Sequence, residues 1–402
     1  MKKSWFVWLG MICGSTYAQS HLHQGPWRVS MQLNDSCVLP FNMEVHEKNV
    51  DIINAEERIS VDEITYSGDS VFIKMPLFDS ELRGKFSETA MTGVFLNHAR
   101  TTKNRIPFHA DYGLGFRFID RPEKTKADFS GRWEVEFAGE NPETKMAIGE
   151  FKQDGNRITG TFLTLTGDYR YLQGDVGGNR FFLSAFDGSH AFLFDALLQS
   201  DGSLHGNFYS GLHWHGTWTA KRNEKAKLSN ADSLTFIKPG YDRIRFTFPD
   251  TDSNLVSLSD KKFQNKIVIV QIMGTWCPNC MDETAFLAPF YKKYKDKGVE
   301  IIGLDFERTT DFSKVKQNLL RLKNRYDIGY TLLFAGSTDP VLRLKALPML
   351  DRILSFPTTI FIDRKGKVRK IHTGFSGPAT GAHYEKWENE FYELINRMLS
   401  EK

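Results

Sequence analysis

Apolar residues follow two different patterns in the two halves of this chain. In the first half, short segments of alternating apolar and polar residues are separated by turns rich in Gly, Asp and Asn, for example at 154–156 (DGN). Regular short strands with such turns are typical of antiparallel β-sandwiches or barrels. We therefore expect two β-rich units here, at 21–122 and 128–222, with almost no helix.

The two β-rich units also share short sequence matches, which suggests a duplication. The tripeptide GPW at 25–27 opens the first unit, and GRW at 131–133 opens the second. Two further pairs of segments match, namely 72–79 with 181–187 and 82–86 with 204–208. A repeat this long predicts two related domains rather than a solenoid.

After a charged linker at 223–233, the pattern changes to buried apolar runs that alternate with helical spacing. Runs rich in β-branched residues predict buried strands, and apolar residues at intervals of three and four predict helices. The predicted strands are 267–272, 299–305, 330–334, 356–363 and 367–372, and the predicted helices follow Cys277 and cover 312–326 and 384–399. This order indicates an α/β domain with a mixed sheet over 234–402, which we expect to fold independently.

Cys277 and Cys280 lie where the first predicted strand of this domain gives way to a helix. The free N–H groups and the dipole of a helix N-terminus stabilise a thiolate, and the spacing lets the second thiol reach the first sulfur. A zinc site would need four ligands, but no second CxxC or CxxH is present. A purely structural disulfide in so short a ring gains little loop-closure entropy. We therefore interpret the pair as a redox-active dithiol.

Length and charge narrow the function further. The chain has 402 residues, enough for two or three domains, and a net charge of +3. So small an excess does not indicate a nucleic-acid-binding protein. No uninterrupted apolar run reaches the ~18 residues that a bilayer span needs, so no membrane-spanning helix is expected in the mature chain.

The first residues resemble a signal peptide. Lys2 and Lys3 precede a short apolar segment, and small residues allow cleavage after Ala18, so 1–18 is predicted to be removed on export. Lipoprotein processing at Cys13 is the less favoured alternative. Beyond the signal, Cys37 is the odd cysteine, and we interpret it as a small buried hydrophobe.

Several other polar residues are candidates for binding. If His213 and His215 shared one face of a strand, with His190 and His205 upstream, they would be possible metal or haem ligands. No carboxylate or cysteine with ligand spacing joins them, so an ordinary polar strand face is favoured. We expect no metal site and no cofactor. A basic loop in the first unit is interpreted as solvated; it contains Arg100, Lys103 and Arg105.

The segment from about 255 to 402 resembles the thioredoxin superfamily and, within it, the TlpA/ResA-like periplasmic thiol–disulfide oxidoreductases. The matched features are the motif WCPNC at 276–280, Glu283, FPTT at 356–359 and GFSG at 374–377. The dipeptide between the cysteines is Pro-Asn, whereas thioredoxin has Gly-Pro. Because this dipeptide tunes thiolate stability, the redox potential and direction do not follow from the resemblance.

The resemblance implies roles for individual residues. Cys277 would be the attacking thiolate, Cys280 the resolving thiol and Pro357 a cis-proline that faces the dithiol. The substrate-facing positions would be Trp276, Pro278, Asn279, Phe356 and Thr358. Glu283 matches the acidic residue that this subfamily keeps near the site. On a helix it lies on the Cys280 side, where burial would raise its pKa and let it shuttle a proton.

Two functions remain open on this basis. The first is an exported oxidoreductase that reduces or isomerises disulfides of envelope proteins, with an upstream membrane or periplasmic electron donor. The second is a surface or ligand-binding protein whose β units carry the main function, with an auxiliary thioredoxin domain. A peroxidase is weaker, because that chemistry wants a Thr and a Pro ahead of the cysteine, and only Thr275 is near.

Overall fold

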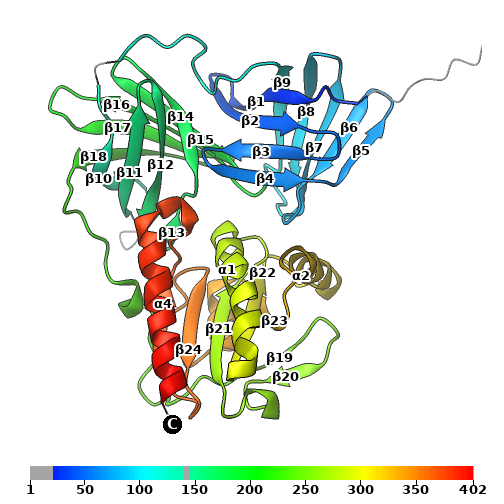
Figure 1. Ribbon diagram of the computed structural model, residues 1–402, viewed down its shortest axis with the longest axis vertical. Helices are drawn as coiled ribbons and strands as arrows, with labels where there is room; N and C mark the ends of the chain where they lie inside the picture. The colour runs from blue at the N-terminus through cyan, green and yellow to red at the C-terminus, as the bar shows by residue number, and fades with distance from the viewer. Residues whose placement is uncertain (1–20, 126, 140–144, 402) are drawn as a thin grey trace, which may run out of the picture.

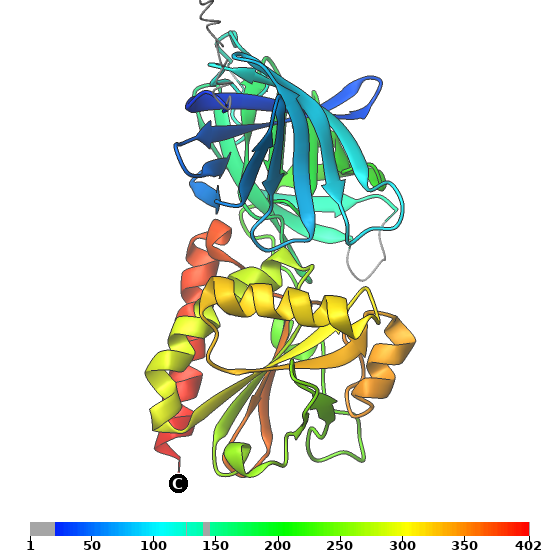
Figure 2. The ribbon, with the colours of Figure 1, turned by 90° about the vertical axis from the view of Figure 1, so that its right-hand side faces the viewer.

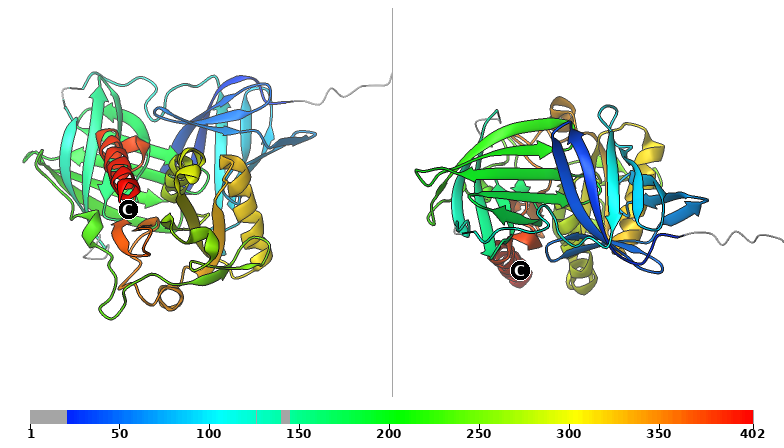
Figure 3. Two further views of the ribbon diagram at one scale, coloured as in Figure 1. Left: turned by 60° about the horizontal axis from the view of Figure 1, so that its bottom comes forward. Right: turned by 90° about the horizontal axis from the view of Figure 1, so that it is seen from above.

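The computed structural model describes residues 21–125, 127–139 and 145–401. The predicted signal segment 1–18, with Cys13, lies outside this range. Two antiparallel β units form one layer of the molecule, and an α/β domain forms the other (Figures 1 and 2). In the view from above, the two β units lie side by side (Figure 3). No helix in the described part of the chain is both long and apolar enough to cross a membrane.

The first β unit is an open antiparallel sheet. Its strands are β1 (Gly25–Asn34), β2 (Cys37–Val45), β3 (Val50–Asn54), β4 (Glu57–Val61), β5 (Ile64–Ser67), β6 (Ser70–Lys74), β7 (Ser80–Phe86), β8 (Ala90–Asn97) and β9 (Arg105–Tyr112). They pair in the order β4-β3-β2-β1-β9-β8-β7-β6-β5. Alternate residues of β1 point into the core, as the sequence pattern predicts. The successive strands β4 and β5 are the two free edges.

The second β unit is a closed barrel. Its strands are β10 (Gly131–Phe137), β11 (Met146–Asp154), β12 (Arg157–Thr164), β13 (Gly167–Asp168), β14 (Leu172–Gly177), β15 (Arg180–Phe186), β16 (Ala191–Leu198), β17 (Leu204–Ser210) and β18 (Trp214–Arg222). β10 pairs with both β11 and β18, and β11 also pairs with β12, which completes the ring. The fold class predicted for the first half of the chain is thus confirmed.

The two units begin in the same way. Gly25 and Gly131 both have positive φ, at 122° and 102°, where a side chain would be strained. The indole Nε1 of Trp27 donates to the carbonyl of His23 at 2.9 Å, and Trp133 Nε1 donates to Phe129 O at 2.9 Å. In both units, therefore, the first strand carries a tryptophan whose indole binds the backbone carbonyl four residues earlier.

One of the sequence matches between the units is wrong in register. We compared the two sheets by following the strand order β1-β9-β8-β7-β6 in the first and β10-β18-β17-β16-β15 in the second. By this count β15 corresponds to β6, in agreement with the match of 72–79 to 181–187. The counterpart of β17 is β8, however, and not the β7 strand that the match of 82–86 to 204–208 implied. A Gly flanked by alternating apolar residues occurs in all three strands, which explains the displacement by one hairpin.

The α/β domain has a five-stranded mixed sheet in the order β23-β22-β21-β24-β25. Its strands are β21 (Ile267–Met273), β22 (Val299–Glu307), β23 (Thr331–Ser337), β24 (Thr358–Ile362) and β25 (Val368–Thr373), and its helices are α1 (Pro278–Tyr294), α2 (Phe312–Tyr326), α3 (Pro340–Ala346) and α4 (Ala382–Ser400). A hairpin of β19 (Thr247–Pro249) and β20 (Leu255–Ser257), which the sequence analysis did not predict, precedes the sheet.

Both faces of this sheet are covered, which is why its central strand is apolar throughout. Ile267 and Ile269 of β21 pack in the cluster that holds α1, α2 and α4, while Val268 and Val270 pack on the opposite side. All seven residues of β21 are buried. The carboxyl end of β21 therefore delivers the next residues of the chain to the upper edge of the domain, which faces the β units (Figure 1).

Polar contacts join the three bodies. Arg117, in the segment between the β units, donates to Ser184 O at 3.0 Å, to Ile53 O at 2.9 Å and to Asn54 Oδ1 at 3.2 Å, and it is 2% exposed. After the barrel, the chain packs on the α/β domain at η1 (Ala231–Ser233), where Asp232 pairs with Lys370 at 3.0 Å. The charged linker is thus attached to the surface of the domain that it precedes.

Candidate active site

Cys277 and Cys280 lie at the N-terminus of α1, directly after the end of β21. Cys277 is the N-cap residue, and its Sγ accepts a hydrogen bond from the backbone N–H of Cys280 at 3.2 Å. Pro278 occupies the first helical position, where the missing N–H costs nothing. The two cysteines form a disulfide with their Cα atoms 5.3 Å apart. An attacking thiolate at position 277 would sit at the positive end of the helix dipole.

The peptide bond between Phe356 and Pro357 is cis, in the loop that leads into β24. Cys277 Sγ lies 3.4 Å from the carbonyl oxygen of Phe356, so this loop is in direct contact with the dithiol. The rings of Trp276 and Phe356 meet edge to face at 5.3 Å between centroids. The residues on either side of the dithiol are therefore aromatic and belong to two separate segments of the chain.

Glu283 is fully buried behind Cys280. Thr359 Oγ1 donates to Glu283 Oε1 at 2.6 Å, and Gln271 Nε2 donates to its other oxygen at 2.9 Å and to the carbonyl of Cys280 at 3.2 Å. Burial raises the pKa of Glu283 to about 7, although both hydrogen bonds act in the opposite direction. The carboxyl can therefore take up or release a proton near neutral pH, and Gln271 links it to the backbone of the resolving cysteine.

Two further buried carboxyls, at Asp305 and Glu307, lie beside the start of the motif. Glu307 Oε1 accepts from the backbone N–H of Thr275 at 3.1 Å and also from its hydroxyl. Burial raises the pKa of both carboxyls, and the charge of Glu307 raises that of Asp305 further. Sequence analysis missed this pair, although two acidic residues at the end of an apolar strand were a visible signal.

The part of the chain that carries the dithiol is similar to known proteins. Residues 241–386 match the Redoxin family. The thiol–disulfide oxidoreductase ResA of Halalkalibacterium halodurans is 28% identical over 163 residues, which are 40% of this chain and 79% of the relative. ResA of Bacillus subtilis is 31% identical over 138 residues, which are 34% of this chain and 69% of the relative. The chain belongs to the ResA-like oxidoreductases through its C-terminal domain.

The family assignment confirms the predicted resemblance and makes the protein a thioredoxin-like thiol–disulfide oxidoreductase. Among solved structures, the thioredoxin domain of a thiol-disulfide oxidoreductase from Bacteroides vulgatus is 24% identical, with 40% of this chain and 99% of that chain covered and a TM-score of 0.28. The Redoxin match begins at residue 241, after both β units. What the β units add must therefore be inferred from their own contacts.

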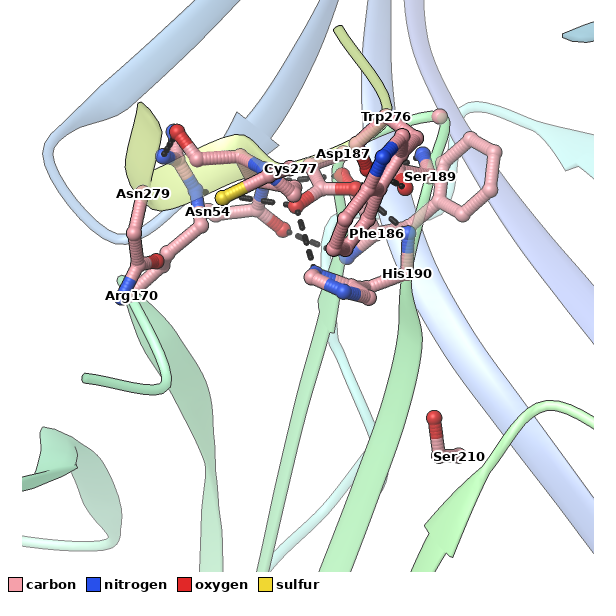
Figure 4. Close-up of polar contacts among 12 residues, drawn as sticks. Asn54, Arg170, Phe186, Asp187, Ser189, His190, Ser210, Trp276, Cys277 and Asn279 are labelled. Atoms are coloured by element: carbon pink, nitrogen blue, oxygen red, sulfur yellow. Dashed lines mark hydrogen bonds and ion pairs between the residues drawn. The ribbon is translucent and has the colours of Figure 1, made fainter. Parts of the chain in front are cut away.

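The barrel covers the dithiol, and its loops bind the motif itself. Ser189 Oγ donates to Trp276 O at 3.2 Å (Figure 4), and Asn279 Nδ2 donates to the carbonyl of Asp168 at 3.3 Å. Pro278 is buried, and Cys277 is only 5% exposed. Of the residues predicted to face a substrate, Pro278 and Asn279 thus face the second β unit at close range.

Thr358 does not face a substrate. Its side chain is 0% exposed, and its hydroxyl donates to the carbonyl of Ser355 at 2.8 Å, inside the loop that carries the cis-proline. The prediction was wrong because this position begins β24, and the strand turns the side chain inward. Trp276 and Phe356 remain partly exposed beside Cys277.

Close to the dithiol, Arg170 links the barrel by ion pairs to the first β unit and to the α/β domain. Its guanidinium pairs with Glu57 of the first β unit, with Asp282 of α1, and with Asp187 of the barrel at 3.6 Å. Nη1 also donates to Pro278 O at 3.3 Å. Burial raises the pKa of Asp282 to about 6 even though Arg170 opposes this shift, so the pair is strongly desolvated. These contacts between distant segments were not predictable from sequence.

Two predictions about basic residues are wrong. His213 and His215 do not share a strand face, because His213 lies in the turn before β18, whereas the ring of His215 stacks on Tyr209 at 4.2 Å. Arg100 is not simply solvated: it is half-buried and donates to His213 Nε2 at 3.2 Å. Cys37 is half-buried on β2, and burial raises the pKa of its thiol.

Proposed function

We propose that the protein reduces or isomerises disulfides of exported proteins, with Cys277 as the nucleophile and Cys280 as the resolving thiol. The observation that carries the proposal is the dithiol at the start of α1, with the cis-Pro357 loop against Cys277 and the protonatable Glu283 behind Cys280. The helix N-terminus favours the thiolate, and the buried carboxyl supplies a proton acceptor or donor.

In the reducing direction, the Cys277 thiolate attacks one sulfur of the substrate disulfide. A Cys277–substrate bond forms, the substrate S–S bond breaks, and the leaving thiolate is protonated. The Cys280 thiolate then attacks Cys277 Sγ, which releases the second substrate thiol and leaves the Cys277–Cys280 disulfide. Two electrons pass to the substrate, so a membrane or periplasmic dithiol donor is required to reduce the pair again.

The experiment measures the rate at which dithiothreitol reduces insulin disulfides in the presence of the wild-type protein or of variants of single cysteines. Cys277→Ser should lower the rate to the uncatalysed background, while Cys37→Ser, on strand β2 of the first unit, should match wild type. In the native host, Cys280→Ala should accumulate mixed disulfides with exported proteins, visible on non-reducing gels and absent when Cys277 is also replaced. Wild-type turnover equal to that of Cys277→Ser would refute the proposal.

Export is part of the same proposal and rests on the sequence of 1–18 alone. Intact mass measurement of the protein from its native host should give a chain that begins at or near Gln19; retention of Met1 would contradict export by this route. A separate binding function of the β units is not proposed, because loops of the second unit line the cavity that contains Cys277.

A further inference from the structure

A cavity of about 540 Å³ separates the dithiol from the mouth of the barrel. Cys277, Pro278 and Asn279 line one side, and loops of the second β unit line the other. Figure 4 shows Cys277 and Trp276 next to Asp187 and His190, which come from a barrel loop. The volume lies in the range of small-molecule and peptide sites. A substrate sulfur must enter this cavity to reach Cys277.

Two arginines converge on the cavity from different bodies. Arg100 comes from the loop after β8 in the first unit, and Arg308 follows β22 in the α/β domain. The Arg308 guanidinium lies 4.3 Å from the centre of the ring of Trp276, which precedes Cys277 in sequence. Arg100 reaches across to His213 of the barrel at 3.2 Å. The two cations of the cavity therefore come from the first unit and the α/β domain, and the barrel places His213 beside Arg100.

These charges repel one another. The pKa of Arg308 is lowered to about 10 by desolvation and then by Arg100, and that of His213 to about 4 by desolvation, Arg100 and other nearby cations. His213 is thus neutral and accepts from Arg100. A site that concentrates like charge in this way is stabilised by a bound anion.

In the described ranges, neither Arg100 nor Arg308 has an acidic group within ion-pair distance. Asp168 is the acidic residue among the described residues that line the cavity, and its two oxygens accept from the backbone N–H groups of Gly377 and Arg170, each at 2.6 Å. Glu307 acts on Arg308 from further away, and burial raises its own pKa. Among the described residues, the donors of Arg308 and those of Arg100 that do not bond His213 are left for a ligand.

Aromatic side chains complete the cavity. Phe192 and Phe208 lie at the barrel mouth, Trp214 is 39% exposed at the rim, and Trp276 and Phe356 flank Cys277. Aromatic walls beside fixed cations suit a ligand that has an apolar part and a carboxylate within a few bonds of each other.

We propose that this cavity selects anionic disulfides, with carboxylates next to the substrate disulfide held by Arg100 and Arg308 and the apolar flank packed on the aromatic wall. The inference rests on the proposed function, because it assigns the substrate class of the same dithiol. The carboxylates belong either to a low-molecular-weight disulfide or to an acidic segment of a protein, and both present the same chemistry to the arginines.

The first test varies only the charge of the substrate. Disulfide dimers of the peptides Ac-Glu-Cys-Phe-NH2, Ac-Gln-Cys-Phe-NH2 and Ac-Lys-Cys-Phe-NH2 are reduced by the wild-type enzyme, and kcat/KM is compared. We expect the Glu peptide to exceed the Gln peptide by about tenfold, as a charge-assisted contact would give, and the Lys peptide to be slowest. The preference should shrink as salt is raised. Equal values for the three peptides would overturn the proposal.

The second test varies the protein. Arg308→Gln and Arg100→Gln should each reduce the Glu-to-Gln ratio of kcat/KM several-fold. Arg245→Gln removes the same charge from an exposed site on the hairpin side of the α/β domain and should leave the ratio unchanged. Two arginines from separate bodies guard against the misfolding of one variant. An unchanged ratio in both would refute their role.

The source of the carboxylate is decided by a third comparison. The disulfide of N-acetylcysteine is compared with that of its amide, which lacks the carboxylate. A preference for the acid in this pair points to small disulfides, whereas a preference confined to the peptides points to protein segments. Either result supports the site. If the enzyme shows no preference for the acid in either comparison, the proposal is overturned.

Binding without chemistry separates this inference from the proposed function. In a Cys277→Ser/Cys280→Ser protein, calorimetry should show tighter binding of the Glu peptide dimer than of the Gln dimer. If wild type reduces none of the probes but this preference in binding remains, the proposed function fails and the anion site stands. If all probes are reduced alike and bound alike, only the anion site fails.

Discussion

The two β units start from the same local structure but close differently, and loops of the closed one bond directly to the dithiol motif. In the first unit, β4 and β5 follow each other in the chain without pairing, so the sheet has free edges. In the second, pairing of β11 with β12 completes a ring. Loops of the ring bind Trp276 and Asn279, while the open unit adds Glu57 and Arg100.

The difference indicates how an accessory domain can shape a redox site. A closed barrel has no edge strand to pair with other chains, and its core fixes the loops at its mouth. An open sheet offers less restraint and here supplies single side chains from its turns. We therefore expect damage to the barrel to alter the dithiol, and equal damage to the open unit to leave it nearly intact.

Breaking the Arg170 contacts should have the largest effect. Arg170→Met leaves Glu57, Asp187 and Asp282 without their common cation, and removal of one partner of a buried ion pair costs about 3–5 kcal/mol. Denaturant unfolding should show that loss, and alkylation of reduced Cys277 should be faster because the barrel separates from α1.

Arg121→Met is the matched control, since this arginine is 94% exposed. It should change the free energy of unfolding by less than about 0.5 kcal/mol. If Arg170→Met behaved like the control, the three bodies would be held together by contacts other than this cluster.

Trp133→Ala and Trp27→Ala compare the two units directly. Both indoles are almost fully buried and make the same bond to the chain, so each truncation should cost about 3–5 kcal/mol in the unfolding of its own unit. Only Trp133→Ala should also speed alkylation of Cys277, because loops of the barrel bond directly to the residues on either side of Cys277. Equal acceleration in both variants would mean that the open unit shields the dithiol as much as the barrel does.

Local elements of the α/β domain were predictable from sequence. The helix predicted at 312–326 is observed with the same limits, because Asp311 caps it and an apolar stripe runs along it. The predicted strand at 330–334 runs from 331 to 337 instead, since its later residues pair with β22 and not with a sequence-local partner. Ends set by tertiary pairing leave little trace in the sequence.

Some features of the candidate site were likewise predictable from sequence, and others were not. The dithiol follows from its short motif at a strand–helix junction, whereas the cis-proline position and Glu283 follow from the family resemblance. Arg100 contacts a histidine 113 residues away, and Arg170 joins residues of three bodies, so no local pattern reveals either contact. Thr358 was misplaced because its orientation depends on where β24 begins. The cavity exists only after the three bodies meet.

The smallest effect concerns Glu283, on the face of the dithiol that the barrel does not reach. Its pKa is about 7 in the folded protein against a usual 4.5, so the folded state binds more protons than the unfolded state between these values. Stability contributed by the protonated carboxyl is complete below about pH 4.5 and is lost as pH rises through 7. The difference in pKa corresponds to about 3 kcal/mol.

Glu283→Gln removes the titration and keeps the shape. Replacing an acceptor oxygen by NH2 disturbs the bonds from Thr359 and Gln271, but that cost is the same at every pH. The free energy of unfolding of the variant minus that of wild type should therefore rise by up to about 3 kcal/mol from pH 4.5 to 8. Thiol exchange near neutral pH should slow in the variant if this carboxyl serves Cys280. A pH-independent difference would show that Glu283 keeps an ordinary pKa despite its burial, and the proton for Cys280 would then have to come from another group.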